Sequence, residues 1–176
     1  MNADRTYKEK LTDLRTFMFD VDGVFTDNTV LLQPGEEPAR TFYVRDAYAV
    51  QHAVKEGLRI VIVSGGRSKA VEESFARSGV TEIYMGVGDK YALFEKLCRE
   101  NTIDPGTTAY MGDDIPDLRV MREVAFPCSP SDAAEEVKAI CAFVSRYPGG
   151  RGCVRDLLEQ TLKVHGRWLS YGAYTW

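Results

Sequence analysis

The sequence predicts an α/β fold, in which a doubly wound parallel sheet carries helices on both faces. Short apolar runs of strand length recur along the chain, and segments with the spacing of amphipathic helices lie between them. Strands that alternate with helices form a parallel sheet, because each crossover places a helix on one of its faces. The length of 176 residues, with 44% hydrophobic and 27% charged residues, suits one globular domain. We therefore expect a single domain over residues 1–176.

The expected strands are the apolar runs. They read TFMFD (16–20), LRIVIVS (58–64), EIYMG (82–86), TAYMGD (108–113), VAFPC (124–128) and, more weakly, AICAFV (139–144). Helical patterns fill the intervals, at residues 46–57, 66–79, 89–101, 113–124 and 131–140. The first of these helices has Asp46 as its expected N-cap and Gly57 as its stop, and the last has Ser131 and Asp132 as its cap.

Two further segments depart from this alternation. Residues 28–44, NTVLLQPGEEPARTFYV, predict two short strands around a Pro/Gly turn. We expect a β-hairpin flap over about residues 24–45, which is far too short for a separate domain. The tail, about residues 148–176, predicts one helix and then an aromatic, aperiodic end, HGRWLSYGAYTW. That end is expected either to be disordered or to pack on a partner.

The charge balance argues against two classes of partner. A net charge of −4 and a pI near 5.3 disfavour nucleic acids and anionic membrane surfaces. No segment approaches membrane-spanning length, and the polar N-terminus lacks the apolar run of a signal peptide. The four cysteines show no metal-binding spacing and are expected to be reduced thiols. We expect a soluble, cytoplasmic protein, and a small anionic substrate held by a few local cations fits this balance.

Polar residues follow several of the expected strands directly. Asp20, Ser64, residues 86–89 and residues 112–113 each come just after an apolar run. In doubly wound folds, ligands bind beyond the carboxyl ends of the strands. The sequence therefore predicts that these residues converge on one crevice.

Asp20 and Asp22 flank a single valine at the end of the first strand. In extended backbone both side chains point toward one side, where two carboxylates repel each other unless a cation joins them or one is protonated. A hard cation such as Mg²⁺ fits this pattern, and Gly23 gives the backbone room to turn. Alone, the pattern is also compatible with a surface turn or a calcium-like loop.

A candidate phosphate cradle begins at Ser64. Its hydroxyl precedes Gly65 and a second glycine, whose backbone N–H groups are expected at a helix start. Arg67 is expected in the first turn of that helix, where the dipole disfavours a cation, so that an anionic ligand would explain it. Lys90 also opens a helix. Taken singly, Arg67 and Lys90 are equally compatible with solvated surface residues.

These motifs share a known order. DVDGVFTD, then VSGG, DK and GDDIPD resemble the haloacid dehalogenase (HAD) superfamily of phosphotransferases, over nearly the whole chain. The resemblance implies that Asp20 is a nucleophile that forms an aspartyl phosphate. It implies that Asp22 is the general acid and then the general base. Ser64 and Lys90 would hold the transferring phosphoryl group.

The same resemblance implies a Mg²⁺ site. Its ligands would be Asp20, the backbone carbonyl of Asp22 and Asp113, with waters completing the octahedron. Asp114 and Asp117 are expected behind these ligands, where they orient metal-bound waters or the lysine. An acidic cluster of this kind is costly without a metal or hydrogen-bond donors.

A narrower resemblance concerns the substrate. The flap, VRDAYAVQ, SGGRS, MGDDIPDLRVM and GGRGCVRD resemble the 3-deoxy-D-manno-octulosonate 8-phosphate (KDO 8-phosphate) phosphatases, which are capless tetramers of lipopolysaccharide sugar synthesis. The resemblance implies a homotetramer with active sites between subunits. Arg45 and Asp46 would help bind the sugar acid across a subunit boundary, and the tail around residues 150–152, with Arg151, would reach a neighbouring site. Arginine suits a carboxylate because its planar fork matches the two oxygens.

Several positions depart from the family pattern. Ala47 and Asn28 stand where glycine is usual, residues 72–74 lack the usual arginine, Ser64 replaces the commoner threonine, and a doubled glycine precedes Arg67. The catalytic set is untouched, whereas the sugar-binding set is altered. A phosphatase for a nine-carbon, sialic-acid-like sugar phosphate is therefore an open alternative.

Two alternatives come from other classes. A receiver domain also combines acidic residues, a hydroxyl and a lysine, but Asp22 and the late acidic cluster favour fast turnover. A catalytically idle scaffold, or the partner module of a sugar-activating enzyme, would need no intact catalytic set. The retention of Asp20, Asp22, Ser64, Lys90 and Asp113 argues against it.

Overall fold

The fold was analysed in a computed structural model, which describes residues 6–32 and 34–176. Its centre is one sheet of six strands in the order β3-β2-β1-β4-β5-β6, and every strand pair is parallel. The strands are β1 Thr16–Phe19, β2 Arg59–Val63, β3 Glu82–Tyr84, β4 Thr108–Met111, β5 Phe126–Ser129 and β6 Phe143–Val144. Each lies within an apolar run of the sequence, so the predicted parallel α/β fold is confirmed.

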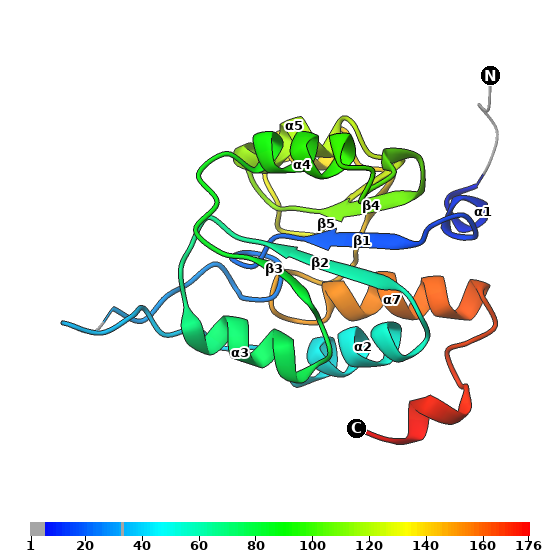
Figure 1. Cartoon of the computed structure of the whole chain (residues 1–176), viewed down its shortest axis with the longest axis horizontal. Helices are drawn as coiled ribbons and strands as arrows, with labels where there is room; N and C mark the ends of the chain where they lie inside the picture. Colours follow the sequence, from blue (N-terminus) through cyan, green and yellow to red (C-terminus); the bar gives the residue numbers. More distant parts are fainter. Residues whose placement is uncertain (1–5, 33) are drawn as a thin grey trace.

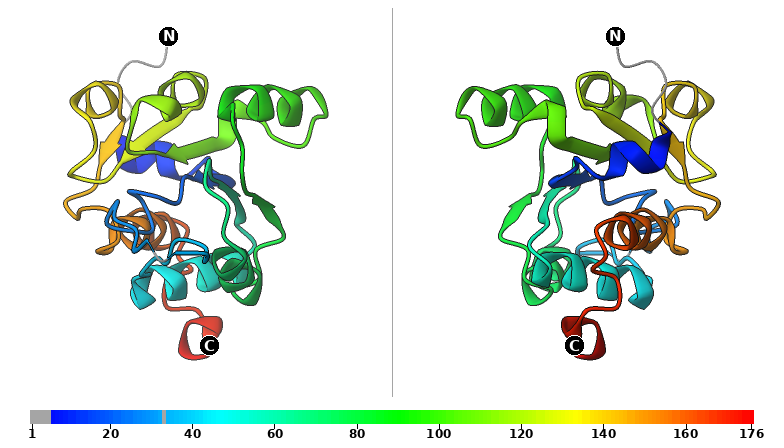
Figure 2. Two further views of the ribbon diagram at one scale, coloured as in Figure 1. Left: turned by 90° about the vertical axis from the view of Figure 1, so that its left-hand side faces the viewer. Right: turned by 90° about the vertical axis from the view of Figure 1, so that its right-hand side faces the viewer.

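Helices cover both faces of the sheet. They are α1 Tyr7–Leu11, α2 Val44–Lys55, α3 Lys69–Arg77, α4 Lys90–Arg99, α5 Leu118–Met121, α6 Glu135–Lys138 and α7 Cys153–Val164, with 3-10 turns η1 Pro105–Thr107, η2 Ile115–Asp117 and η3 Tyr171–Tyr174. Figures 1 and 2 show α4, α5 and α6 on one face and α2, α3 and α7 on the other. No helix in the described part of the chain is long and apolar enough to cross a membrane.

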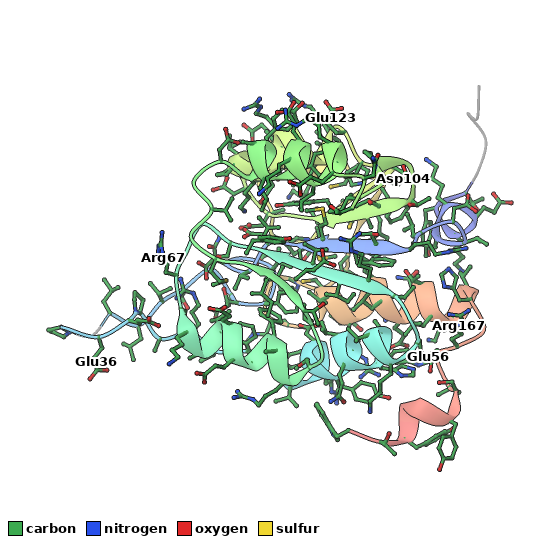
Figure 3. The ribbon with its side chains drawn as sticks, viewed as in Figure 1. Glu36, Glu56, Arg67, Asp104, Glu123 and Arg167 are labelled. Atoms are coloured by element: carbon green, nitrogen blue, oxygen red, sulfur yellow. The ribbon has the colours of Figure 1, made fainter. Side chains whose placement is uncertain are left out.

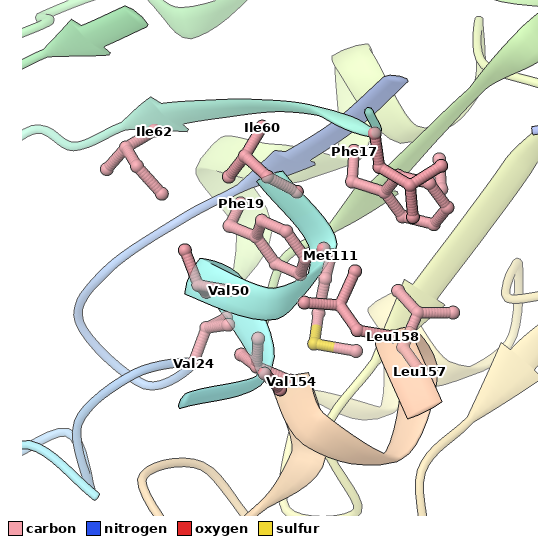
Figure 4. Close-up of a cluster of buried hydrophobic side chains, with 14 of the residues drawn as sticks. Phe17, Phe19, Val24, Val50, Ile60, Ile62, Met111, Val154, Leu157 and Leu158 are labelled. Atoms are coloured by element: carbon pink, nitrogen blue, oxygen red, sulfur yellow. The ribbon is translucent and has the colours of Figure 1, made fainter. Parts of the chain in front are cut away.

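Alternation along the strands divides the core into two layers. Phe17 and Phe19 of β1 point toward α2 and α7, where they meet residues such as Val50 and Leu158 (Figure 4). Met18, between them in β1, points to the opposite face and joins the cluster that includes Phe94 of α4. Because both faces of the sheet are buried, the central strands β1, β2 and β4 are apolar on both sides at every position after their first residue.

Three predicted helix starts differ from the structure. α2 begins at Val44 with Tyr43 as its N-cap, so that Asp46 lies inside the first turn instead of capping it. α3 begins at Lys69, because the Ser68 hydroxyl accepts a hydrogen bond from the Val71 N–H and caps the helix there. α6 has Ala134 as its N-cap in place of the expected Ser/Asp pair.

The flap pairs less extensively than expected. In place of two strands, its described residues form one antiparallel bridge, between Leu31 and Ala39. Figure 1 shows this segment projecting from the same side as the carboxyl ends of the strands. The antiparallel course of a hairpin is therefore present, although the strands are not.

The tail folds back on its own chain. Its predicted helix is α7, and the aromatic end beyond it lies against α2. The Trp168 ring packs edge-on against Tyr48 and His52, and the Tyr48 hydroxyl donates a 2.6 Å hydrogen bond to the Ala173 carbonyl. Neither expected outcome, disorder or packing on a partner, is observed, because this segment packs on α2 of its own chain.

Candidate active site

The predicted site residues converge at the carboxyl edge of the sheet. A cavity of about 570 Å³ opens there, between the ends of β1, β2 and β4. Eight of the residues singled out from the sequence line it: Asp20, Asp22, Ser64, Gly65, Lys90, Asp113, Asp114 and Asp117. The expected convergence of these residues at the carboxyl ends of parallel strands is therefore observed.

Asp20 is a buried carboxylate that directly follows β1. Its backbone N–H donates to the Met111 carbonyl (3.0 Å), which anchors the residue to the neighbouring β4. One carboxylate oxygen, Oδ1, lies 2.9 Å from Nζ of Lys90. Burial raises the pKa of Asp20 to about 6, the charge of Asp117 adds to this, and the ammonium of Lys90 opposes it. Asp20 is thus mainly ionised at neutral pH and faces the cavity.

Lys90 lies between two carboxylates. It is the first residue of α4, which Asp89 caps, and its Nζ contacts Asp20 and also Oδ1 of Asp117 (2.7 Å). Burial lowers the pKa of Lys90, but the two carboxylates outweigh this and raise it above its ordinary value. The lysine is therefore a fixed positive charge beside Asp20.

Asp117 receives a partner that the sequence did not reveal. The hydroxyl of Tyr110, in β4, donates a 2.7 Å hydrogen bond to Oδ1 of Asp117. The other oxygen, Oδ2, accepts from the Asp113 N–H at 3.2 Å. A tyrosine inside an apolar strand is normally predicted to be a core residue. The one sequence signal for this bond is that a buried tyrosine hydroxyl needs a hydrogen-bond partner. Asp117 therefore contacts Lys90 at the wall of the cavity, and its expected supporting role stays a prediction.

Three carboxylates could share a cation. Asp20, Asp113 and Asp117 each offer an oxygen, and these oxygens lie within 4.8 Å of one another. Burial, together with the charges of Asp20 and Asp117, raises the pKa of Asp113 to about 7. Such crowding is relieved by a hard cation with oxygen ligands, so the donor set fits Mg²⁺. Both oxygens of Asp117 already accept hydrogen bonds, Oδ1 from Lys90 and Tyr110 and Oδ2 from the Asp113 N–H, so the Asp20 and Asp113 oxygens are the better placed ligands.

The loop after Asp20 is built to approach Asp113 closely. Gly23 has a φ of +82°, and a Cβ there would lie 2.0 Å from Oδ2 of Asp113. Asn28, which stands where the family usually has glycine, has a φ of +64° and donates a 3.0 Å hydrogen bond from Nδ2 to the same oxygen. The asparagine thus keeps the left-handed backbone and adds a contact that glycine lacks.

Asp22 is held by a different cation from Asp20. Both residues line the cavity, yet the Asp22 carboxylate forms a two-pronged ion pair with Arg40, Nε to Oδ1 at 2.6 Å and Nη2 to Oδ2 at 2.9 Å. Arg40 comes from the flap, and its role could not be predicted from the sequence, because an arginine in a charged, irregular segment resembles a solvated one. The pair ties the flap to the cavity.

Of the expected anion site in the Ser64 loop, Ser64 and Gly65 lie at the cavity and Arg67 does not. Ser64 is buried, its hydroxyl accepts from the Gly66 N–H at 3.1 Å, and no acceptor within the described residues takes the Gly65 N–H. Arg67 differs from the prediction. It precedes the Ser68 cap, is exposed, and does not line the cavity; Figure 3 shows it pointing outward. The dipole argument for an anion at Arg67 therefore does not apply.

The predicted sugar-binding residues separate into two groups. Arg45 and Arg151 line a second cavity, of about 590 Å³, next to α7. Asp46 is buried, and its carboxylate accepts hydrogen bonds from the backbone N–H groups of Gly152 (3.1 Å) and Arg155 (2.7 Å). Burial raises the pKa of Asp46 to about 6. The structure therefore corrects the expectation for Asp46, which joins α2 to the start of α7 and is not open to a sugar.

The segment before α7 packs on the loop that follows Asp20. The Gly150 N–H donates to the Val24 carbonyl (2.9 Å), and the Arg151 guanidinium lies 3.8 Å from the Asp27 carboxylate. In the described chain, residues 150–151 therefore support the loop that follows Asp20 in the same subunit.

Comparison with known proteins places the chain. No family model matches it. It is 32% identical to the 3-deoxy-D-manno-octulosonate 8-phosphate phosphatase of Escherichia coli K12 over 158 residues, 90% of this chain and 84% of that enzyme. The chain belongs to the KDO 8-phosphate phosphatase family. The expected family, and with it the enzyme class of phosphatases, is confirmed.

Solved structures of KDO 8-phosphate phosphatases share the fold. The enzyme from Yersinia pestis has a TM-score of 0.88 at 28% identity, covering 93% of this chain and 88% of that one. The enzyme from Moraxella catarrhalis, solved with magnesium, phosphate and KDO, has a TM-score of 0.84 at 29% identity, covering 89% and 90%. The fold is that of HAD superfamily hydrolases, as expected.

Proposed function

We propose that the chain is a Mg²⁺-dependent phosphatase that hydrolyses KDO 8-phosphate to KDO and phosphate. The observation that carries the proposal is the buried Asp20 carboxylate, which lies 2.9 Å from Lys90 in a cavity that also holds Asp113. A member of the same family has been solved with magnesium, phosphate and KDO.

Hydrolysis proceeds in two steps at Asp20. In the first, its carboxylate attacks phosphorus, the bond from phosphorus to the sugar oxygen breaks, and Asp22 gives that oxygen a proton. In the second, Asp22 takes a proton from a water that attacks phosphorus, and the Asp20 carboxylate is released with inorganic phosphate. Ser64, the Gly65 N–H and Lys90 hold the phosphoryl oxygens in both steps.

Asp20, Asp113 and the Asp22 carbonyl would hold the Mg²⁺. When bound, the ion offsets the negative charge of the phosphoryl group and of the carboxylates around it. Asp117 holds Lys90 toward Asp20 (Lys90 Nζ to Asp117 Oδ1, 2.7 Å), and Asp114 lines the same edge of the cavity. Both therefore act by orienting the groups that touch the substrate or the ion.

The sugar acid is proposed to bind between subunits of a homotetramer. Arg45 and Arg151 share the second cavity and lie apart from the one that holds Asp20, so a neighbouring subunit is needed to bring them to a substrate. Their planar guanidinium groups suit a carboxylate. Each subunit, residues 1–176, would act as one catalytic domain.

The proposed setting is the cytoplasm, where KDO for lipopolysaccharide is made. All four cysteines are free thiols, and Cys128 and Cys153 are buried. This state fits a reducing compartment.

The test is phosphate release with Mg²⁺ present, from KDO 8-phosphate, a nine-carbon 2-keto-3-deoxy sugar acid 9-phosphate and hexose phosphates side by side. Strong preference for KDO 8-phosphate supports the proposal. If the enzyme prefers the nine-carbon sugar phosphate, or hydrolyses several substrates equally well, the phosphatase activity stands and the proposed substrate is wrong. No release from any of them would support the idle scaffold or partner module.

A further inference from the structure

Arg40 extends from the flap to Asp22, which lines the cavity, and it is largely buried at this contact. Its side chain is 8% exposed, whereas that of its partner Asp22 is 33% exposed. A third guanidinium nitrogen, Nη1, donates to the Pro38 carbonyl at 3.1 Å. All three guanidinium nitrogens thus donate hydrogen bonds. The pair with Asp22 is two-pronged and largely buried on the arginine side, unlike an exposed surface ion pair.

The Ser64 loop leaves space for this guanidinium. A Cβ at Gly66 would lie 2.9 Å from Nη2 of Arg40, 3.3 Å from Oδ2 of Asp22 and 3.5 Å from Oγ of Ser64. The second glycine of the SGG sequence therefore admits the ion pair, directly beside the proposed phosphoryl site. Three segments distant in sequence meet at this point: the loop after β1, the loop after β2 and the flap.

The geometry limits what Asp22 can do in this arrangement. Each carboxylate oxygen accepts one hydrogen bond from Arg40, at 2.6 and 2.9 Å, so the carboxylate is fixed in direction. Each oxygen keeps a second lone pair, which can carry the proton that Asp22 transfers. A group that exchanges a proton with substrate must also reach the leaving oxygen in a defined orientation. Arg40 is placed to set that orientation.

We propose that Arg40 is a positioning residue for Asp22, so that the flap takes part in proton transfer. This inference rests on the proposed function, since it requires Asp22 to be the general acid. It predicts that the loss of Arg40 acts through Asp22 and harms the substrates that need a proton on the leaving group.

The test is a double-mutant cycle with two leaving groups. Wild type, Arg40→Gln, Asp22→Asn and the double variant are assayed for kcat/KM with KDO 8-phosphate, whose alkoxide leaving group needs a proton, and with 4-nitrophenyl phosphate, whose phenolate does not. kcat/KM reports the steps up to formation of the phosphoenzyme, in which the leaving group departs. Arg40→Lys keeps the charge without the fork, and Glu36→Gln, at the exposed flap tip (Figure 3), is the matched flap control.

We expect Arg40→Gln to lower kcat/KM for the sugar phosphate about 10- to 100-fold, a part of the roughly 100- to 10,000-fold that general acid catalysis contributes. The aryl phosphate should change less than about threefold, and Arg40→Gln should add less than about twofold in the Asp22→Asn background, since the interaction is then already lost. Arg40→Lys should fall between wild type and Arg40→Gln, and Glu36→Gln should match wild type.

Other outcomes overturn the inference. An equal loss for both substrates, or the same loss in the Asp22→Asn background, would show that Arg40 binds the phosphoryl group directly. An unchanged Arg40→Gln would show that it does neither. If wild type rejects KDO 8-phosphate but hydrolyses another sugar phosphate, the proposed substrate fails and the cycle is run with that ester. If wild type hydrolyses no phosphate ester, the inference falls with the proposed function.

Discussion

The Tyr110 hydroxyl donates a 2.7 Å hydrogen bond to the Asp117 carboxylate, on the same oxygen, Oδ1, that contacts Lys90. A side chain that is fully buried in β4 thus fixes the direction of a carboxylate at the edge of the cavity. Through Asp117, the strand also fixes the lysine that faces Asp20. Hydrogen bonds and ion pairs thus link the buried strand β4 to the charged side chains of the candidate site.

Removal of this hydroxyl should be felt at the site. Tyr110→Phe keeps the ring packing but takes one donor from Asp117, which retains its contact with Lys90. We expect a loss of about 1 kcal/mol in the free energy of unfolding, measured by urea denaturation. A several-fold fall in kcat should accompany it, because Lys90 is less well fixed. Tyr174→Phe, at an exposed tyrosine, is the control. A kcat of Tyr110→Phe equal to that of the wild type would contradict a role of the Tyr110 hydroxyl in fixing Lys90.

The carboxylates of the expected Mg²⁺ site should make the stability of the metal-free protein depend on pH. Asp113 has a pKa raised to about 7, above its unfolded value of 3.8, so the folded state binds more protons between these values. The free energy of unfolding should therefore fall as pH rises from about 4 to 7. Mg²⁺ binds the ionised carboxylates, and its affinity should rise over the upper part of this range.

These expectations can be measured without activity. The melting temperature of the metal-free protein should be several degrees lower at pH 7.5 than at pH 5.5, and Mg²⁺ should reduce the difference. Asp113→Asn should raise the metal-free melting temperature at pH 7.5 and weaken Mg²⁺ binding, followed by titration calorimetry. A variant that binds Mg²⁺ as wild type does would remove Asp113 from the site.

Asp46 and Arg45 are neighbours in sequence but should differ in effect. Asp46 holds the backbone N–H groups of Gly152 and Arg155, so Asp46→Ala should cost about 2–3 kcal/mol in the free energy of unfolding. Asp46→Asn keeps an acceptor and should cost less, with little change in KM. Arg45→Gln should do the reverse, raising KM for the sugar phosphate at unchanged stability. An Asp46→Asn enzyme with a selectively raised KM would return Asp46 to the sugar site.

Much of the fold and site follows from local sequence signals. The strands lie in apolar runs because both faces of the sheet are buried, and Asp20, Ser64 and Asp113 follow strands whose carboxyl ends share an edge. What was missed depends on contacts between distant segments. Arg40 meets Asp22 only because the flap returns over the site, and Asp46 is buried only because α7 packs on α2. The position of Arg67 had a local signal, the capping Ser68, that was overlooked.

The most direct test of the account is to find where the phosphoryl group resides during turnover. The enzyme is mixed with KDO 8-phosphate and Mg²⁺, quenched with acid within one turnover, and its peptides are mapped by mass spectrometry. We predict an acid-stable, hydroxylamine-sensitive phosphate on Asp20, and no phosphopeptide or phosphate release from Asp20→Asn. Phosphorylation of another residue, or turnover by Asp20→Asn, would contradict the assignment of Asp20 as the nucleophile.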